Sequence, residues 1–394
     1  MKASIPLAAQ EILSVFDHAG VEAWLVGGSV RDSLLGKKPD DLDLATAASP
    51  QQIQALFAHT IPTGARYGTI TVLWKDTHAE ITTFRKEQGT DDARHPQAVV
   101  FGGTIEEDLS RRDFTLNAMA WHPQRGILDP FGGQQDLQAG LLRAVGEPAL
   151  RFQEDALRIL RVYRFSSQLG FTIEPNTYAA ARQSMALTAF LSGERIQAEW
   201  RKLLCGQHPA LAFTPDLLQF WRELGFAFHL LAEKTARFDE LPPTPTVRWG
   251  AFFYLMGLPL EEVGKRLHFS NQTKREIADL FRLLREPFLA DKKALKKWLA
   301  VLPVHSLEQS LQIRTILLQE NTAIARENLT AVLAYQEPYL VRHLALKGKE
   351  LMALGFVGPA CGEAQQLLLA HVLSFPEENT KERLKAFLRA LPLS

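Results

Sequence analysis

Near residue 146 the hydrophobic pattern of this chain changes, and the change limits where a sheet can form. Before that point, short runs of β-branched and aromatic residues predict strands at "AWLVGG" (23–28), "GTITVLW" (68–74), "AEITTF" (79–84) and "AVVFGG" (98–103). Beyond it, almost every segment has apolar residues at helical spacing, and no further strand is expected. The pattern predicts an α+β chain, in which a mixed sheet with helices, residues 1–145, precedes a long all-α region.

Composition and charge exclude several classes of protein. The 394 residues include 44 Lys plus Arg and 44 Asp plus Glu, so a basic surface for nucleic acid has to be local. The two cysteines lie far apart in the sequence, which argues against a disulfide framework and against a cysteine zinc site. The N-terminus lacks the apolar run of a signal peptide, and no stretch of about 18 apolar residues is present. These features predict a soluble, cytoplasmic protein with no membrane span.

The segment 26–45, "VGGSVRDSLLGKKPDDLDLA", contains two alternating carboxylates. On a strand, Asp41 and Asp43 would project to the same face, while Leu42 and Leu44 would point into the core. Two close carboxylates repel each other unless a cation lies between them, and their hard oxygen atoms suit Mg²⁺. A solvated acidic turn is the alternative interpretation.

A glycine turn precedes these carboxylates. Gly27 and Gly28 allow the backbone to approach a phosphate group, and Arg31 supplies a cation that pairs with one. A glycine-rich turn followed by paired carboxylates is what metal-assisted phosphoryl transfer requires. Neither a P-loop nor a Rossmann fingerprint is present, because the sequence here contains no GxxxxGK[ST] and no GxGxxG.

Two arginine-rich segments follow. In "RRDFTLNA", the residues Arg111, Arg112 and Asp113 precede an apolar run, which fits a capped helix start as well as a nucleotide contact. The segment 151–170, "RFQEDALRILRVYRFSSQLG", predicts one helix that is buried on one face. Its polar stripe, with a spacing of three residues, consists of Asp155, Arg158, Arg161 and Arg164. An exposed, salt-bridged helix is the other interpretation of that stripe.

Five motifs in order resemble one known family. "GGSVRDSLLGKKPDDLDLA", "EEDLSRRDFTLNAMA", "DPFGG", "RFQEDALRILRVYRF" and "ERIQAEWRKLL" are similar to the successive motifs of the class II nucleotidyltransferases of the polymerase-β-like superfamily. This group holds the tRNA CCA-adding enzymes and the bacterial poly(A) polymerases. The C-terminal "LALKGKELMALGFVGPACGEAQQLLLAHVL" resembles the tail of the Gram-positive CCA-adding enzymes. The resemblance implies a nucleotidyltransferase head (1–145), then an all-α neck (146–205), body (206–310) and tail (311–394).

The resemblance also implies roles for individual residues. Asp41 and Asp43 would bind catalytic Mg²⁺, and Glu80, on a neighbouring predicted strand, is either a third catalytic carboxylate or an ordinary strand glutamate. The triphosphate would lie against Gly28, Arg31 and Arg112. Asp113 would accept a hydrogen bond from the ribose 2′-OH, and Arg161 and Arg164 would support the base or the triphosphate.

Asp155 and Arg158 correspond to the base-selecting pair of the family. A carboxylate only accepts hydrogen bonds and a guanidinium only donates them. Cytosine and adenine each present an amino donor beside a ring-nitrogen acceptor, which this pair satisfies. Uracil and guanine present the reverse order and would leave buried polar groups unpaired, which is costly. The pair therefore predicts that C and A are admitted and that U and G are rejected.

Other segments concern the choice of product and the RNA. The polar segment "KEQGTDDARHPQAVVF" (86–101) matches a flexible loop that CCA-adding enzymes have, with Arg94 and His95 before its proline. Residues 265–297 hold ten Lys and Arg against four Asp and Glu, which fits either a solvated face or contacts to an RNA backbone. The proline-rich 239–249, "DELPPTPTVRW", is the best candidate for a linker in the helical part.

The predicted function is template-independent addition of C, C and A to the 3′ end of tRNA from CTP and ATP, with release of pyrophosphate. The expected partners are CTP, ATP, the tRNA acceptor end and upper half, and in one possible assembly a second copy of the chain. The alternatives are a poly(A) polymerase, an enzyme that adds only CC or only A, and an inactive RNA-binding or chaperone module.

Overall fold

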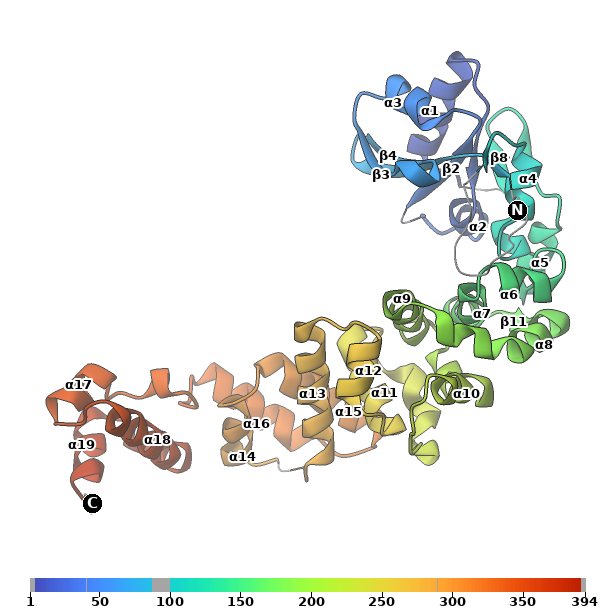
Figure 1. Ribbon diagram of the computed structural model, residues 1–394. Helices are drawn as coiled ribbons and strands as arrows, with labels where there is room; N and C mark the ends of the chain where they lie inside the picture. Colours follow the sequence, from blue (N-terminus) through green and yellow to red (C-terminus); the bar gives the residue numbers. More distant parts are fainter. Residues whose placement is uncertain (1–3, 40, 87–99, 289, 391–394) are drawn as a thin grey trace. The chain divides into compact units, whose positions relative to one another are not determined.

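The structure is a computed structural model that describes residues 4–39, 41–86, 100–288 and 290–390 (Figure 1). It divides into two compact units, Met1–Gly225 and Phe226–Ser394. The segment 86–101, expected to form a flexible loop, lies for the most part outside the described residues. Within the described ranges, no helix combines the length and the apolar character that crossing a membrane requires.

A seven-stranded mixed sheet forms the first part of the first unit, which confirms the predicted α+β class. Only β2 and β5 pair in parallel, and the other neighbours are antiparallel. In sheet order the strands are β3 (Thr60–Gly64), β4 (Thr69–Trp74), β5 (Thr77–Thr83), β2 (Leu42–Thr46), β1 (Ala23–Val26), β8 (Ala120–His122) and β9 (Gly126–Leu128). The strands predicted at "AWLVGG", "GTITVLW" and "AEITTF" are confirmed as β1, β4 and β5.

Among the residues that the structure describes, four two-residue strands lie outside this sheet. The strand predicted at "AVVFGG" is described only at β7 (Val100–Phe101), which pairs with β6 (Arg85–Lys86). In the other pair, β10 (Leu141–Leu142) lies parallel to β11 (Thr172–Ile173). The expectation of no strand beyond residue 146 was therefore wrong at β11, because two residues are too few to show a period of two in the sequence.

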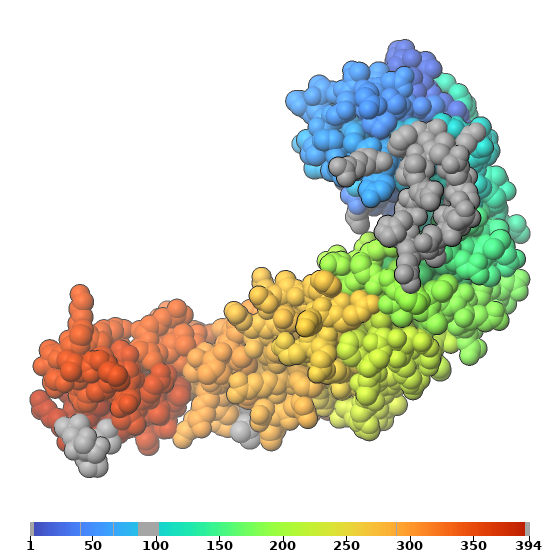
Figure 2. Space-filling model, viewed as in Figure 1, coloured from blue at the N-terminus to red at the C-terminus, as the bar shows by residue number. Residues whose placement is uncertain are grey.

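Ten helices and four 3₁₀ segments accompany the sheet among the described residues of the first unit. The α-helices are α1 (Leu7–His18), α2 (Gly28–Leu34), α3 (Pro50–Leu56), α4 (Ile105–Ser110), α5 (Gly133–Ala139), α6 (Pro148–Glu154), α7 (Leu157–Leu169), α8 (Pro175–Gln183), α9 (Gly193–Leu204) and α10 (Pro215–Glu223). The 3₁₀ segments are η1 (Ala65–Tyr67), η2 (Thr115–Asn117), η3 (Met185–Phe190) and η4 (Pro209–Phe213). On the face shown in Figure 2, the surface runs without interruption from the sheet region to the green helices.

Local sequence explains the helices that cover the sheet. In α1, apolar residues at helical spacing, among them Phe16, are fully buried, and β1 is buried along its whole length. Ser49 begins α3 with a capping box, and Pro50 occupies its first turn, where a missing N–H costs nothing. The rings of Phe16 and Phe57 lie 5.4 Å apart and join the two helices over the sheet (Figure 1).

The helix predicted over 151–170 is broken at Asp155. This residue has extended backbone angles (φ −148°, ψ 103°) and separates α6 from α7. One carboxylate oxygen of Asp155 accepts a hydrogen bond from the N–H of Leu157, at 3.1 Å, in the first turn of α7. The prediction of a single helix was wrong because an aspartate at this place can cap a new helix instead of continuing the old one.

The second unit is all-helical within its described residues. Its elements are η5 (Ala232–Glu240), α11 (Pro245–Met256), α12 (Leu260–Arg266), α13 (Asn271–Arg285), α14 (Lys292–Leu299), α15 (Val304–Leu317), α16 (Ala323–Ala334), η6 (Val341–His343), α17 (Gly348–Ala353), α18 (Pro359–Ser374), η7 (Pro376–Glu378) and α19 (Lys381–Ala390). The linker prediction for 239–249 was wrong, because the boundary between units follows residue 225. Arg248 is 2% exposed and donates hydrogen bonds to four backbone carbonyls between Phe238 and Pro242, so the segment is packed.

Candidate active site

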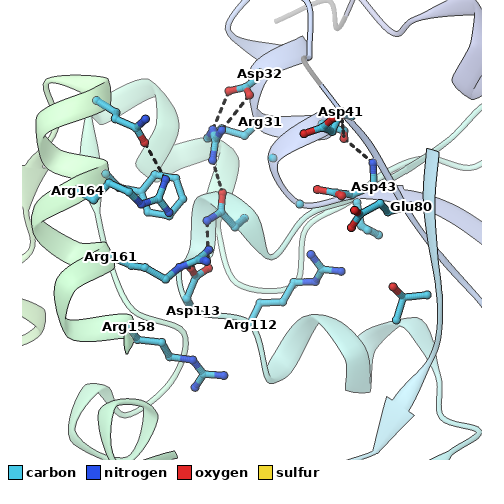
Figure 3. Close-up of a pocket in the computed structure, with 18 of the residues that line it drawn as sticks. Arg31, Asp32, Asp41, Asp43, Glu80, Arg112, Asp113, Arg158, Arg161 and Arg164 are labelled. Atoms are coloured by element: carbon cyan, nitrogen blue, oxygen red, sulfur yellow. Dashed lines mark hydrogen bonds and ion pairs between the residues drawn. The ribbon is translucent and has the colours of Figure 1, made fainter. Parts of the chain in front are cut away.

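A pocket of about 950 Å³ in the first unit brings together most of the residues singled out from the sequence. Carboxylates lie on the side of the sheet, and arginines lie on α7 opposite them (Figure 3). All eleven predicted site residues line it: Gly28, Arg31, Asp41, Asp43, Glu80, Arg112, Asp113, Asp155, Arg158, Arg161 and Arg164. Residues more than a hundred positions apart therefore share one cavity, and its size suits a nucleotide.

The carboxylates project from the beginning of β2. Leu42 and Leu44 are buried, 2% and 1% exposed, and Asp43 between them faces the pocket, as the alternation predicted. Asp41 precedes the strand and is exposed. Asp43 pairs in register with Glu80 of β5, so the parallel β2–β5 pairing brings the second strand's carboxylate to the same place.

Ser29 of α2 fixes the backbone between the two aspartates. Its hydroxyl donates to the carbonyl of Asp41, at 3.0 Å, and accepts from the N–H of Asp43, at 2.8 Å. Ser29 is 1% exposed, so these two bonds are shielded from water. The glycine turn and the carboxylate strand are thereby held together by one side chain.

The charges around Asp43 suit a cation. Burial raises the pKa of Asp43 to about 6; Glu80 and Asp41 add to the rise, and Arg112 and Arg31 oppose it. A divalent ion beside this carboxylate would relieve that repulsion, and the donor set, all carboxylate oxygen, fits Mg²⁺. Among the described residues no three His, Cys, Asp or Glu side chains converge closely enough to enclose a metal ion. The residues therefore fit a metal held by Asp41 and Asp43 that completes its shell with other oxygen atoms.

Gly27 is the position in the turn that requires a glycine. Its φ is +67°, and a Cβ there would lie 2.8 Å from Nη1 of Arg112 and 3.7 Å from Oδ2 of Asp43. At Gly28 a Cβ would make only an ordinary contact with Arg31, at 3.5 Å. The turn thus lets the Arg112 guanidinium lie against the backbone beside the carboxylates.

Arg111 and Arg112 share one buried carboxylate. Nη2 of Arg111 donates to Oδ1 of Asp108, at 2.6 Å, and Nη2 of Arg112 donates to Oδ2, at 3.0 Å. Burial alone would raise the pKa of Asp108, but the two guanidinium groups hold it below its usual value. Both arginines thus pair with the acidic segment that precedes them, while the apolar run after them forms only the 3₁₀ segment η2 and the strand β8.

A chain of hydrogen bonds crosses the pocket from α2 to α7 (Figure 3). Nη1 of Arg31 donates to Oδ1 of Asn117, at 2.7 Å, and Nδ2 of Asn117 donates to Oδ1 of Asp113, at 3.0 Å. Nε of Arg161 donates to Oδ2 of Asp113, at 2.7 Å, and Nη2 lies 2.6 Å from the same oxygen. Burial opposes the charge of Asp113, yet Arg161 and its hydrogen-bond donors hold its pKa below the usual value. Asp113 is therefore an ionised, buried anchor for Arg161.

Asp155 and Arg158 lie at the pocket with separate partners. Both carboxylate oxygens of Asp155 accept from Nη2 of Arg195, at 2.9 Å, which comes from α9. Arg158 donates to a carboxylate oxygen of Glu154, at 2.7 Å, and to the carbonyl of Arg111, also at 2.7 Å. The side chains of Asp155 and Arg158 are thus each held in place by other residues.

Arg164 differs from the exposed cation expected of a salt-bridged helix. Its side chain is 7% exposed and forms an ion pair with Glu199 of α9, Nε to Oε2 at 2.5 Å. Nη1 donates to the side chain of Gln168, at 2.7 Å, and the guanidinium lies 3.7 Å from the ring centre of Phe165. Burial lowers the pKa of Arg164 to about 10, so the group stays charged at neutral pH.

Sequence reasoning missed three residues that arrange the site. They are Ser29, Asn117 and Arg195. All three lie inside motifs quoted from the sequence, "GGSVRD", "RRDFTLNAMA" and "ERIQAEWRKLL". For Ser29 and Asn117 the signal available was a polar residue within an otherwise apolar or small-residue run, which is a reason to look for a buried hydrogen bond. Arg195 stands among other charged and polar residues, so its local sequence carries no such signal.

The basic run of the second unit is less exposed than its composition indicates. Lys296 is 2% exposed and, with Lys292, forms an ion pair with Glu337. Arg282 lies 5.0 Å from the ring centre of Trp298. Lys265, Lys293 and Lys297 remain exposed. Part of this charge therefore serves the fold, and part is available to a partner.

Two family models match the chain. One, described as "Poly A polymerase head domain", matches residues 23–143. The other, described as "Probable RNA and SrmB- binding site of polymerase A", matches residues 170–215. The first covers the sheet and the carboxylates, and the second covers α8 and α9.

Individual proteins extend the similarity. The chain is 47% identical over 207 residues to the CCA-adding enzyme of Lactiplantibacillus plantarum; this alignment spans 52% of the chain and about half, 51%, of that relative. It is 35% identical to the CCA-adding enzyme of Enterococcus faecalis, over 97% of this chain and 95% of that one. The solved structure of the Bacillus stearothermophilus CCA-adding enzyme in complex with CTP has a TM-score of 0.83 and 30% identity, and the match covers 99% of this chain and 98% of that one.

Proposed function

The chain belongs to the family of CCA-adding enzymes, and on that premise we propose that it adds C, C and A to the 3′ end of tRNA from CTP and ATP. The observation that carries the proposal is the pocket in which the carboxylates of Asp41 and Asp43 face a row of arginines. Pyrophosphate is the second product. The reaction takes place in the cytoplasm, where tRNA is matured and used.

Members of this family work with a divalent metal ion, and here the proposed ion is Mg²⁺ held by Asp41 and Asp43. When bound, it lowers the pKa of the attacking 3′-OH and stabilises the pyrophosphate that leaves. Glu80 lies beside Asp43 and adds negative charge that favours a cation at this place. Ser29 keeps the two aspartates in position during the reaction.

The triphosphate is proposed to lie between Gly28, Arg31 and Arg112. Arg31 is fixed by two hydrogen bonds to Asp32, 2.8 and 2.9 Å, and one to Asn117. Of its five N–H groups, this leaves two that have no partner among the described residues and can bind phosphate oxygens. For Asp113 to accept from a ribose 2′-OH as well, one of the two contacts from Arg161 has to open, because donors already occupy its acceptor positions.

Base choice is proposed to rest on Asp155 as acceptor and Arg158 as donor. Arg195 holds the carboxylate of Asp155 from one side, so the group presents a fixed direction to an amino group of C or A. A carbonyl of U or G in the same place would face a carboxylate, which repels it. Arg161 and Arg164 support the bound nucleotide through the groups that they anchor.

The second unit is proposed to hold tRNA through its exposed basic residues. Lys293 and Lys297 lie on the solvent side of α14, and each can contact a phosphate of the RNA backbone. Replacing both lysines with Glu should raise the KM for tRNA several-fold and leave the KM for CTP unchanged.

The proposed division of the whole chain is a head (1–145), a neck (146–205), a body (206–310) and a tail (311–394).

The decisive experiment supplies each labelled nucleotide in turn to a tRNA that lacks its 3′ CCA. We expect two CMP additions from CTP alone, one AMP after them when ATP is present, and no addition from UTP or GTP. Repeated AMP addition would instead indicate a poly(A) polymerase. Asp43→Ala should abolish the addition of both nucleotides, whereas Asp76→Ala, which removes an exposed carboxylate of the same domain outside this pocket, should not.

A further inference from the structure

Asn117 stands between the two sides of the nucleotide pocket. It is 5% exposed and ends the 3₁₀ segment η2, which packs against α2. Its side chain contacts one group on each side, Arg31 and Asp113. Neither the charge pattern nor the spacing of the motif residues assigns it a role.

The chemistry of the two neighbours fixes how the amide must point. A guanidinium can only donate, so the oxygen of Asn117 faces Arg31; an ionised carboxylate can only accept, so the nitrogen faces Asp113. A carboxylate at this position would repel Asp113, and an apolar side chain would leave both neighbours one hydrogen bond short. An amide of this length satisfies the two groups at once.

Each neighbour is otherwise held by its own partners. Asp32 fixes one edge of the Arg31 guanidinium through Nε and Nη2, and Asn117 accepts from the third nitrogen, Nη1. On the other side, Asp113 accepts from the N–H of Phe114, at 2.8 Å, and pairs with Arg161 of α7. Asn117 thus joins the α2 arginine to the Asp113–Arg161 pair by hydrogen bonds, whereas the ring of Phe165 meets the same two arginines by stacking, at 5.1 and 5.4 Å.

We propose that Asn117 is a positioning residue that couples Arg31 to the Asp113–Arg161 pair, so that the groups for the triphosphate and those for the rest of the nucleotide are oriented together. The inference rests on the proposed function, because it assumes that these arginines face the nucleotide. Loss of the amide leaves Asp155 and Arg158 untouched, and so it weakens the use of every nucleotide without changing base choice.

Thr115 offers a matched control in the same 3₁₀ segment. It is 2% exposed, and its hydroxyl donates to a carboxylate oxygen of Asp136 on α5, at 2.7 Å. Thr115→Val therefore removes a buried hydrogen bond to a carboxylate, as Asn117→Leu does, but on the side away from Arg31 and Asp113. If Asn117 had only a structural role, the two variants should show similar changes in unfolding temperature and in KM for CTP.

The experiment measures thermal unfolding, kcat and KM for CTP, KM for tRNA and the ratio of CTP to UTP use, in the full chain. For Asn117→Leu we expect the KM for CTP to rise on the order of tenfold or more, since hydrogen bonds to charged groups are lost. The KM for tRNA and the CTP to UTP ratio should stay as in the wild type. Thr115→Val should lower the unfolding temperature and leave the KM for CTP unchanged.

A KM for CTP in Asn117→Leu within twofold of that in Thr115→Val would overturn the proposal, as would an altered CTP to UTP ratio. If Asn117→Leu does not fold, Asn117→Ser replaces it; a single short hydroxyl cannot reach both neighbours, so the same rise in KM is expected, and an unchanged KM again overturns the proposal. Failure of the wild type and of Thr115→Val to add CMP would contradict the proposed function itself.

Discussion

The buried ion pair between Arg164 and Glu199 allows a quantitative test of how the helices of the first unit are held. Nε and Oε2 lie 2.5 Å apart, both side chains are 7% exposed, and the angle falls outside hydrogen-bond geometry. Glu199→Gln removes the countercharge of a guanidinium buried between α7 and α9, which then has only neutral acceptors, the new amide oxygen and the side chain of Gln168. Breaking a buried pair from one side typically costs about 3–5 kcal/mol, and the poor angle favours the lower end.

A loss of about 3 kcal/mol should lower the unfolding temperature of the first unit by about 6–12 °C, at about 2–4 °C per kcal/mol for 150–250 residues. Calorimetry of the full chain measures this value, with the two units followed as separate transitions if they unfold separately. The pair Arg237–Glu240 is a control with the same 2.5 Å separation but with side chains 38% and 50% exposed. Glu240→Gln should leave the unfolding temperature almost unchanged, because water screens an exposed ion pair.

The double replacement Arg164→Met with Glu199→Leu separates stability from function. It removes the buried guanidinium that Glu199→Gln leaves unpaired. Most of the free energy of unfolding lost in that single variant should therefore return. In this double variant kcat/KM for CTP should be lower than in the wild type, because residue 164 no longer places a cation at the pocket. A shift below about 2 °C for Glu199→Gln, or no recovery in the double variant, would refute the argument from burial.

Three further predictions concern the pocket. Asp155→Ala should lower kcat/KM for CTP and ATP and narrow their advantage over UTP and GTP, since it removes both an acceptor and a source of repulsion; equal slowing of all four nucleotides would place base choice elsewhere. Gly27→Ala should raise the KM for CTP far more than Gly20→Ala. Both residues have positive φ (+67° and +68°), so the backbone strain is similar, but only a Cβ at Gly27 meets other groups, among them the Arg112 guanidinium. Asp108→Asn should be less stable than the wild type at neutral pH, and this gap should close as the pH falls below about 4, because the lowered pKa of Asp108 stabilises the fold only while the carboxylate is ionised; parallel stability curves down to low pH would contradict this.

Some features of the site follow from local pattern. The alternation of Asp41 and Asp43 with Leu42 and Leu44 predicted which side chains are buried, because a strand imposes a period of two on any sequence that it contains. The predicted strands at β1, β4 and β5 were confirmed for the same reason. The family motifs named most of the charged residues that line the pocket. Glu80 was expected only from its neighbouring predicted strand, and its place beside Asp43 depends on the parallel β2–β5 pairing.

By itself, then, the sequence determined that a sheet domain precedes a helical region, which segment carries the paired carboxylates, and which charged residues gather at the pocket. Only the tertiary structure decided their partners. Arg164 had been expected either in an exposed, salt-bridged stripe or as a support of the base or triphosphate; packing of α7 against α9 buries it with Glu199 beside the pocket. Asp155 had been placed within a helix, but it lies between α6 and α7 and meets Arg195, forty residues away. The physical reason is that local periodicity records which face of an element is apolar, whereas ion pairs and buried hydrogen bonds depend on which elements the fold brings together.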